Sequence, residues 1–345
     1  MRVAFDLSPR APGLPLGVAR VFDGALAALA ARGQVELIPI APPARAAAGA
    51  RRAAWRQLAL PREAARLGAD VLHCFVSAFP LRAALPVIAT VHELPWRHGE
   101  RENAGLVHRA WGALAQRRAA AVVCPSTSVA RALGPRARAI PWGLAPAFCG
   151  AGGQGAPSGA GPIPQAGPAP RPYVLLVGGA RAKKRLDHLL AAQRLARAPW
   201  DIVVTGSEAP AAHAAGATLR SVGRVDDRAL AALYRGAAAC AVLARSEGFA
   251  FPVLEALACG TAVVVPAGSV QAETAGGLAV EVPMDDVEAL AARLDELAKA
   301  PSSPEERAAR SAYAAHFTWD RAAAALEDLW RAALAAQRTS YPAAR

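Results

Sequence analysis

Residues 243–260 read LARSEGFAFPVLEALACG, and this stretch decides the predicted fold. An apolar run closes at Leu243, and Gly248 then permits a tight turn. Pro252 suits the first position of a helix, and Gly260 suits its end. The stretch therefore predicts a strand, a loop and a short helix in succession, which is a building unit of α/β folds.

Two carboxylates flank the start of this predicted helix. Glu247 precedes the helix, and Glu255 lies early within it. Unbonded N–H groups at a helix N-terminus favour phosphate, and a fixed carboxylate can accept hydrogen bonds from neighbouring hydroxyls of a ribose or hexose. The pattern indicates a site for a sugar joined to phosphate, and the alternative is a buried amphipathic helix with ordinary caps.

The stretch resembles the donor-site motif of the retaining glycosyltransferases of family 4, also called the group 1 glycosyltransferases. The matching residues are Glu247, Gly248, Phe249, Pro252, Glu255, Ala256 and Gly260. Ala250 departs from the motif, because the family often has glycine there. The resemblance implies the GT-B fold, an α/β architecture of two Rossmann-like domains with parallel sheets that face each other across a cleft.

The length of 345 residues predicts two domains, each with its own core. Residues 150–172 are almost entirely Gly, Ala, Pro and Ser, and we expect them to form a linker. We therefore expect an N-terminal acceptor-binding domain over 1–149 and a C-terminal nucleotide-sugar donor domain over 173–316. Residues 317–345 resemble the family's closing helix, which packs back on the first domain.

Short apolar runs predict the strands of both sheets. In the first domain the runs lie at 3–7, 35–40, 70–75, 86–91 and 120–124. In the second they lie at 173–177, 201–205, 222–225, 237–243, 263–265 and 278–282. Helices are expected between them, among others at 21–31, 228–239 and 285–298.

The composition predicts a cytoplasmic protein without a structural metal. No charge-free apolar run approaches the roughly 20 residues that span a bilayer, and the apolar stretch at the N-terminus is too short for a signal peptide. The five cysteines are scattered and form no CxxC pair, so neither a disulfide framework nor a zinc site is indicated.

Positive charge is concentrated in the first half of the chain. Residues 1–150 hold 19 Lys and Arg against 8 Asp and Glu. This surplus favours an anionic partner, although an arginine-rich composition alone could also produce it. The basic residues of one segment accompany apolar ones: Arg45, Arg51, Arg52, Trp55, Arg56, Leu58, Leu60 and Arg62. The segment predicts a helix on the anionic inner face of the cytoplasmic membrane, or a solvated helix that covers the domain.

Two candidate site residues lie in the first domain. His92 follows the strand 86–91, and open α/β sheets bind ligands beyond the carboxyl ends of their strands. The resemblance implies that His92 lies beside the transferred sugar, with Glu93 in place of the family's aspartate. Gly17 resembles part of the family's glycine-rich loop, which faces the donor. The loop lacks the GxGxxG fingerprint, and this disfavours a nicotinamide or flavin enzyme.

The remaining candidates bind the donor in the second domain. Lys184 follows a glycine turn and can act as a point charge on a diphosphate, although Gly179 stands where many family members have arginine. The resemblance implies that Glu255 holds the ribose and that Glu247 contacts the transferred sugar as a catalytic residue beside His92. Further donor contacts are implied at Gly206, Val225, Gly248, Phe249, Ala250 and Phe251.

The resemblance implies retaining transfer of a hexose from a nucleotide-diphosphate sugar, such as GDP-mannose or a UDP-hexose, to a glycan or lipid-linked acceptor in bacterial polysaccharide or glycolipid synthesis. The chain has no DxD motif, so no metal or other cofactor is expected. A nucleotide-sugar-binding pseudoenzyme and a GT-B epimerase or phosphorylase are the alternatives. No recognition helix supports nucleic-acid binding.

Overall fold

The computed structural model describes residues 1–8, 16–46, 48–99, 105–149, 171–206, 213–214 and 217–340. The chain divides into two compact units, one formed by Met1–Gly143 with Phe317–Arg345 and the other by Leu144–His316. Residues 150–170 of the predicted linker lie outside the described residues. Residues 144–149, which we assigned to the first domain, belong to the second unit, where the ring of Phe148 lies 6.1 Å from that of Tyr234.

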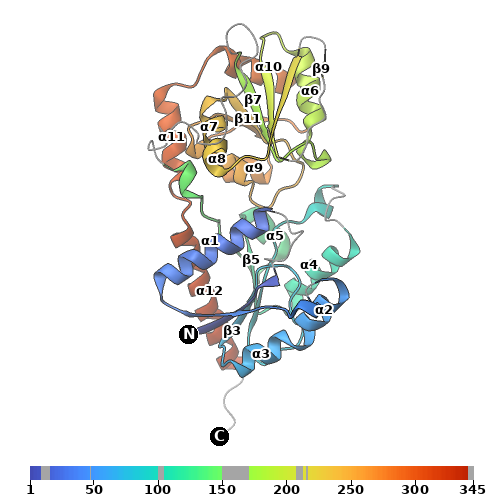
Figure 1. Cartoon of the computed structure of the whole chain (residues 1–345), viewed down its shortest axis with the longest axis vertical. Coiled ribbons are helices and arrows are strands. Elements are labelled where there is room, and N and C mark those ends of the chain that lie inside the picture. Colours follow the sequence, from blue (N-terminus) through green and yellow to red (C-terminus); the bar gives the residue numbers. More distant parts are fainter. Residues whose placement is uncertain are drawn as a thin grey trace. The chain divides into compact units, whose positions relative to one another are not determined.

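A parallel sheet forms the centre of the first unit (Figure 1). Its strands, as far as the chain is described, are β1 (Arg2–Asp6), β2 (Glu36–Ile40), β3 (Val71–Cys74), β4 (Val87–Thr90), β5 (Ala121–Cys124) and β6 (Ala137–Ala139). They lie in the order β2-β1-β3-β4-β5-β6, with Ala4 of β1 opposite Ile38 and Leu72 of its neighbours. Strands β3, β4 and β5 are buried throughout, as expected where helices cover both faces of a parallel sheet.

One helix of the first unit comes from the C-terminal part of the chain. They are α1 (Leu16–Arg32), α2 (Gly49–Leu58), α3 (Leu60–Arg66), α4 (Leu106–Arg118), α5 (Thr127–Leu133) and α12 (Trp319–Ser340). The Thr318 hydroxyl accepts a hydrogen bond from the Arg321 N–H at 3.2 Å and so caps α12 as predicted. Arg32 at the end of α1 pairs with Asp320 and Glu327 of α12 at 2.7 and 3.0 Å.

A buried histidine links α12 to the sheet. The Trp330 indole N–H donates to His73 Nδ1 at 3.2 Å, so the proton of the neutral ring lies on Nε2, which faces the Thr90 hydroxyl at 2.9 Å. Burial, with a smaller contribution from His92, lowers the pKa of His73 from 6.5 to about 3. His73 is therefore a neutral structural residue at physiological pH.

We expect His73 to make stability depend on pH. The unfolded chain binds this proton below pH 6.5, whereas the folded chain excludes it until about pH 3. The free energy of unfolding should therefore decrease as the pH is lowered, by about 2 kcal/mol between pH 7 and pH 5. Urea unfolding of wild type and His73→Asn at both pH values measures the effect, because Asn can still accept from Trp330 but does not titrate. Equal pH dependence in the two proteins would refute this role.

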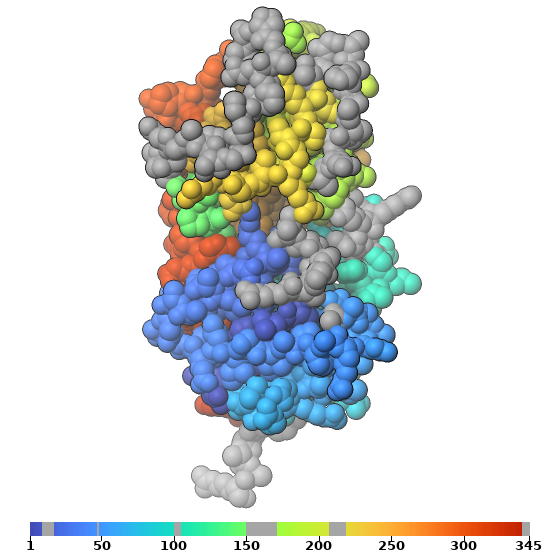
Figure 2. Space-filling model, viewed as in Figure 1, coloured from blue at the N-terminus to red at the C-terminus, as the bar shows by residue number. Residues whose placement is uncertain are grey.

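The segment predicted as one basic helix forms two helices, α2 and α3, and its large apolar residues are buried except for Leu58, which is 57% exposed. Trp55 and Leu60 are buried in the core, and the Arg56 guanidinium is buried too, where its Nε donates to Asp6 at 2.7 Å. Exposed cations such as Arg51 remain on the outer side of α2 and α3, which forms part of the blue surface in Figure 2. Helices α2 and α3 thus cover the first unit, since Trp55 and Leu60 pack into its core.

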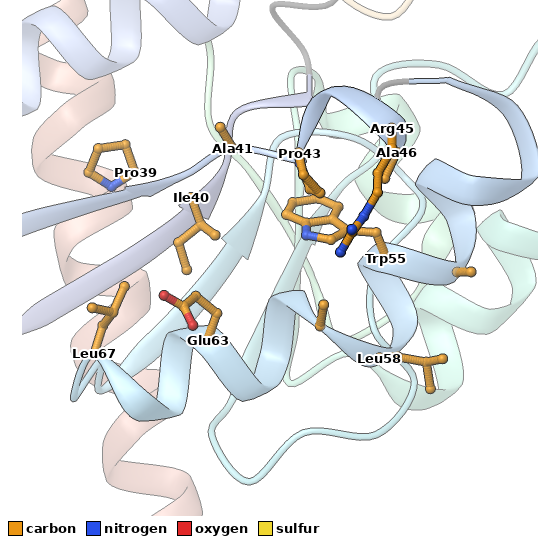
Figure 3. Close-up of a pocket in the computed structure, with 12 residues that line it drawn as sticks. Pro39, Ile40, Ala41, Pro43, Arg45, Ala46, Trp55, Leu58, Glu63 and Leu67 are labelled. Carbon is orange, nitrogen blue, oxygen red and sulfur yellow. The ribbon is translucent and has the colours of Figure 1, made fainter.

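An open cavity of about 620 Å³ lies between β2 and the two helices α2 and α3 (Figure 3). Its walls are mostly apolar and include Pro39, Ile40 and Pro43, with the Trp55 indole and the Arg45 side chain on one side.

No helix in the described part of the chain is both long and apolar enough to span a bilayer.

The second unit has its own sheet (Figure 1). Its described strands are β7 (Tyr173–Val177), β8 (Asp201–Thr205), β9 (His213–Ala214), β10 (Ala217–Gly223), β11 (Ala239–Ala241), β12 (Val263–Pro266) and β13 (Val280–Val282), in the order β13-β12-β11-β7-β8-β10-β9. All pairs are parallel except the short β9–β10 pair at one edge, so the sheet is parallel as predicted. The predicted strand 222–225 is wrong in its bounds, because the chain turns at Gly223, where φ is 66°.

The helices of this unit connect and cover the strands. They are α6 (Leu186–Leu195), α7 (Asp227–Gly236), α8 (Phe251–Ala258), α9 (Val270–Ala275), α10 (Val287–Lys299) and α11 (Pro304–Ala314). The core packs α6 and α10 against the sheet through residues such as Leu189, Ile202 and Leu294, all of which are fully buried.

Candidate functional site

The strand order of the second unit marks one point for ligand binding. From β7 the chain first adds β8 and β10 on one side, and it then crosses to add β11 on the other. The order therefore reverses between β7 and β11, and ligands of open α/β sheets bind at the carboxyl ends of such strands. The loop after β7 carries Lys184, and the loop after β11 carries Glu247.

Glycines allow the loops after β7 and β8 to approach closely. The N–H groups of Gly178 and Gly179 both donate to the Thr205 carbonyl at 2.9 Å. A Cβ on Gly206 would lie 2.6 Å from the Gly179 nitrogen, and a Cβ on Gly178 would lie 2.8 Å from Cε of Lys184. Larger residues would therefore push the loops apart or displace the Lys184 stem.

Lys184 and Glu247 form an ion pair between the two loops. The Lys184 ammonium donates to Glu247 Oε1 at 2.7 Å, and Lys183 Nζ lies 4.0 Å from Oε2. The two paired side chains are only 10% and 14% exposed. Burial opposes ionisation of Glu247, but Lys184, Lys183 and Arg181 outweigh it and lower its pKa. Glu247 is thus a fixed anion beside a fixed cation.

Glu255 projects from α8 into a buried setting. It is 2% exposed, and the Tyr234 hydroxyl at the end of α7 donates to its Oε2 at 2.9 Å. Burial and then the Glu255 charge raise the pKa of Tyr234 well above its ordinary value, so Tyr234 stays a donor. Thr261 holds the same segment by donating to the Tyr234 carbonyl at 2.6 Å. The sequence alone did not indicate Tyr234.

Ala250 occupies the N-cap of α8 in the left-handed region, with φ 59° and ψ 61°. This conformation explains why glycine suits the position. The neighbouring Phe249 and Phe251 rings meet edge to face, with centroids 5.2 Å apart. From α9, the Thr274 hydroxyl donates to the Phe249 carbonyl at 2.7 Å, and Gln271 donates to the Ala244 carbonyl. Helix α9 therefore anchors both ends of the loop.

We expect Ala250→Gly to stabilise the protein. A left-handed alanine costs about 1–2 kcal/mol, and part of the relief is offset by the greater backbone freedom of glycine in the unfolded chain. The net gain should be about 0.5–1 kcal/mol in urea unfolding. Ala256→Gly within α8 is the matched control and should destabilise by about 1 kcal/mol. A loss of stability in both variants would contradict the strain at Ala250.

The candidate residues His92 and Gly17 lie in the first unit, apart from the donor candidates of the second. His92 is half-buried, and its Nε2 donates to the Phe75 carbonyl at 2.9 Å. Burial lowers its pKa, although the bond to Phe75 and the charge of Glu93 act in the opposite direction. His92 is therefore a neutral ring with Nδ1 as its acceptor. The predicted loop at Gly17 is wrong, because Gly17 lies in the first turn of α1, where it is exposed.

The other predicted donor residues lie around the same sheet edge of the second unit. Gly206 follows β8 with φ 130°, and its N–H donates to the Gly223 carbonyl at 2.8 Å. Val225 lies two residues beyond β10 and is half-buried. Gly248 and Phe249 are buried in the loop before α8. Within the described ranges, no three His, Cys, Asp or Glu side chains gather as metal ligands.

Comparisons with known proteins agree with this arrangement. The D-inositol 3-phosphate glycosyltransferase of Saccharomonospora viridis is 39% identical over an alignment of 119 residues that covers 31% of this chain and only 25% of that relative's length. Sucrose-phosphate synthase of Thermosynechococcus elongatus has a similar structure, with a TM-score of 0.70, 19% identity and coverage of 97% of this chain and 100% of the other.

Two further solved structures share the fold. HepE of Anabaena, in complex with UDP and glucose, has a TM-score of 0.65 at 13% identity and covers 96% of this chain and 100% of its own. WaaG, a glycosyltransferase involved in lipopolysaccharide biosynthesis, has a TM-score of 0.62 at 17% identity, with coverage of 98% and 99%. These likenesses identify the fold as GT-B.

Two family models match the sequence in succession. The model described as Glycosyltransferase Family 4 matches residues 17–142, and the model described as Glycosyl transferases group 1 matches residues 164–317. The second match contains both loops of the site and α8. This chain therefore belongs to the family 4, group 1 glycosyltransferases and has their GT-B fold.

Proposed function

We propose that this protein transfers a sugar from a nucleotide-diphosphate sugar to an acceptor hydroxyl with retention of anomeric configuration. The observation that carries the proposal is the buried Lys184–Glu247 pair at the point where the strand order reverses. It places one cation beside one anion, and Glu247 lies shortly before α8 in the sequence. This combination suits a phosphate bonded to a sugar.

The donor would exchange this ion pair for its own contacts. Its phosphate oxygens accept from the Lys184 ammonium, and a sugar hydroxyl donates to the Glu247 carboxylate. Because both groups are already desolvated by burial, the exchange requires little further loss of hydration. Negative charge that grows on the leaving diphosphate is then stabilised by Lys184 and the start of α8. We propose that this positive charge serves in place of a metal ion.

Retention follows if attack and departure use the same face of the sugar. The acceptor oxygen bonds to the anomeric carbon while the bond to the phosphate oxygen breaks, and that oxygen takes the acceptor proton. Glu247 suits a binding role better than a nucleophilic one, because Lys184, Lys183 and Arg181 lower its pKa and so weaken it as a nucleophile. His92, with Nδ1 as an acceptor, would orient the sugar, and Glu255 would hold the ribose.

The proposed substrates follow from charge and from the relatives. HepE was solved with UDP and glucose, which supports a UDP-hexose as the first donor to test, with GDP-mannose as the second. The surplus of positive charge in residues 1–150 supports an anionic glycan or lipid-linked acceptor. Such acceptors would place the protein in the cytoplasm, at the inner face of the membrane, in polysaccharide or glycolipid synthesis.

Product analysis tests the proposal. The protein is incubated with each nucleotide sugar and a panel of glycan and lipid-linked acceptors, and the anomeric proton of the product is followed by NMR. We expect an α-configured donor to give an α-linked product. An inverted product would refute retention. Donor consumption without a glycosylated acceptor would instead indicate an epimerase, and saturable donor binding without turnover would indicate a pseudoenzyme.

A further inference from the structure

A second group of ion pairs connects the same two loops of the second unit. Its centre is Asp285, which follows β13. The Arg245 guanidinium donates from Nη2 to both Asp285 oxygens at 2.6 and 2.7 Å. Arg185 Nη2 also donates to Asp285 Oδ1, and its side chain is only 7% exposed. One carboxylate therefore holds an arginine from each loop.

The two arginines are sequence neighbours of the residues proposed to bind the donor. Arg185 directly follows Lys184, and Arg245 precedes Glu247 by two residues. The loops are thus joined twice, once directly through Lys184 and Glu247 and once through Asp285. Since β13 lies two strands from β11 in the sheet, Asp285 ties the site to an element that carries none of the predicted donor contacts.

Backbone conformation indicates that the Arg185 end of this second connection is firmly held, while the Arg245 and Asp285 side chains are 42% and 43% exposed. Asp285 has φ 70° and Arg185 has φ 56°; aspartate tolerates this left-handed region, but arginine rarely adopts it. Such conformations persist where the surrounding contacts over-determine them, and they gather at functional sites. Arg185 is held further by Met284, whose sulfur accepts from its Nη1 at 3.2 Å.

We propose that Asp285 is a positioning residue of the donor site, which holds the loops of Lys184 and Glu247 at a fixed separation. The inference rests on the proposed function in one respect, namely that a donor occupies these loops. When the donor takes Lys184 from Glu247, the direct connection between the loops is lost. The Asp285 connection involves neither residue, and it therefore keeps the loops together while the donor is bound.

Hydrogen–deuterium exchange of the ligand-free protein tests the connection itself. In Asp285→Asn the carboxylate is lost, while asparagine still tolerates the left-handed backbone. We expect faster exchange in both 178–185 and 242–250, by about tenfold, with the sheet core unchanged. The matched control is Asp187→Asn, whose carboxylate is 76% exposed and pairs with His188. His188 in turn lies 3.4 Å from Asp285 Oδ1, so the control removes a neighbouring carboxylate while both arginines keep Asp285 as their partner. Unchanged exchange in Asp285→Asn, or equal changes in the control, would overturn the proposal.

Nucleotide affinity tests the consequence for the donor site. The probe is whichever of UDP, GDP and ADP raises the melting temperature of the wild type most. We expect its Kd to rise about tenfold in Asp285→Asn and to stay unchanged in Asp187→Asn. An unchanged Kd in Asp285→Asn would show that Asp285 does not position the donor site. If the wild type binds none of the three, the proposed function fails, while the exchange experiment still decides whether Asp285 joins the loops.

Discussion

Replacing Lys184 with alanine is expected to reduce kcat about 10²–10³-fold, as removal of one preorganised electrostatic stabiliser does in other enzymes. Lys184 is the cation closest to Glu247, at 2.7 Å, and it is almost fully buried. Its loss removes the charge that we propose faces the leaving diphosphate, and it also leaves the buried Glu247 carboxylate without that partner. Steady-state kinetics with the best donor measure the effect.

Two variants separate charge from geometry at this position. Lys184→Arg keeps the charge but not the compact ammonium, and it should recover only part of the activity. Lys183→Ala is the matched control, because Lys183 is equally buried but lies 4.0 Å from Glu247. Equal losses in Lys183→Ala and Lys184→Ala would show that Lys184 has no special role.

Replacing Glu255 with glutamine is expected to raise the Kd of the nucleotide about 10- to 150-fold, which corresponds to the roughly 1.5–3 kcal/mol of a hydrogen bond to a charged group. Glutamine keeps the shape and can still accept from the Tyr234 hydroxyl, so the fold should persist. Isothermal titration with the nucleotide and its 2′-deoxy analogue measures whether the lost affinity belongs to the ribose.

Comparison of the nucleotide with its 2′-deoxy analogue makes the test of Glu255 specific for the ribose contact. We expect the wild type to prefer the ribonucleotide and Glu255→Gln to lose most of that preference. Tyr234→Phe removes only the hydroxyl that contacts Oε2 and should have a smaller effect. An unchanged preference in Glu255→Gln would remove Glu255 from the ribose site.

Local patterns were sufficient to predict most of the sheet strands. The bounds of β7 and β8 agree with the predicted runs 173–177 and 201–205, because glycine or proline closes each run at one end or both. The family's preference for glycine where Ala250 stands also has a local cause, since the position requires a left-handed backbone. Patterns of this kind depend on neighbouring residues and can be recognised in one sequence.

Long-range pairings could not be predicted in the same way. His73 and Trp330 are 257 residues apart, and Asp285 lies 100 residues from Arg185 and 40 from Arg245. The basic run at 45–62 suggested a membrane helix because the sequence does not show that Arg56 meets the buried Asp6. Which residues meet depends on the order of the strands in each sheet. The order of helices and strands along the chain does not specify that arrangement.

The central claim is that the second unit binds a nucleotide sugar through Lys184, Glu247 and Glu255. Titration calorimetry of wild type and Glu255→Gln against UDP-glucose, GDP-mannose and related nucleotide sugars tests it most directly. We predict saturable binding of at least one nucleotide sugar to the wild type and binding at least about tenfold weaker in the variant. Equal affinity in both proteins, or no binding of any nucleotide sugar to the wild type at millimolar concentration, would contradict the claim.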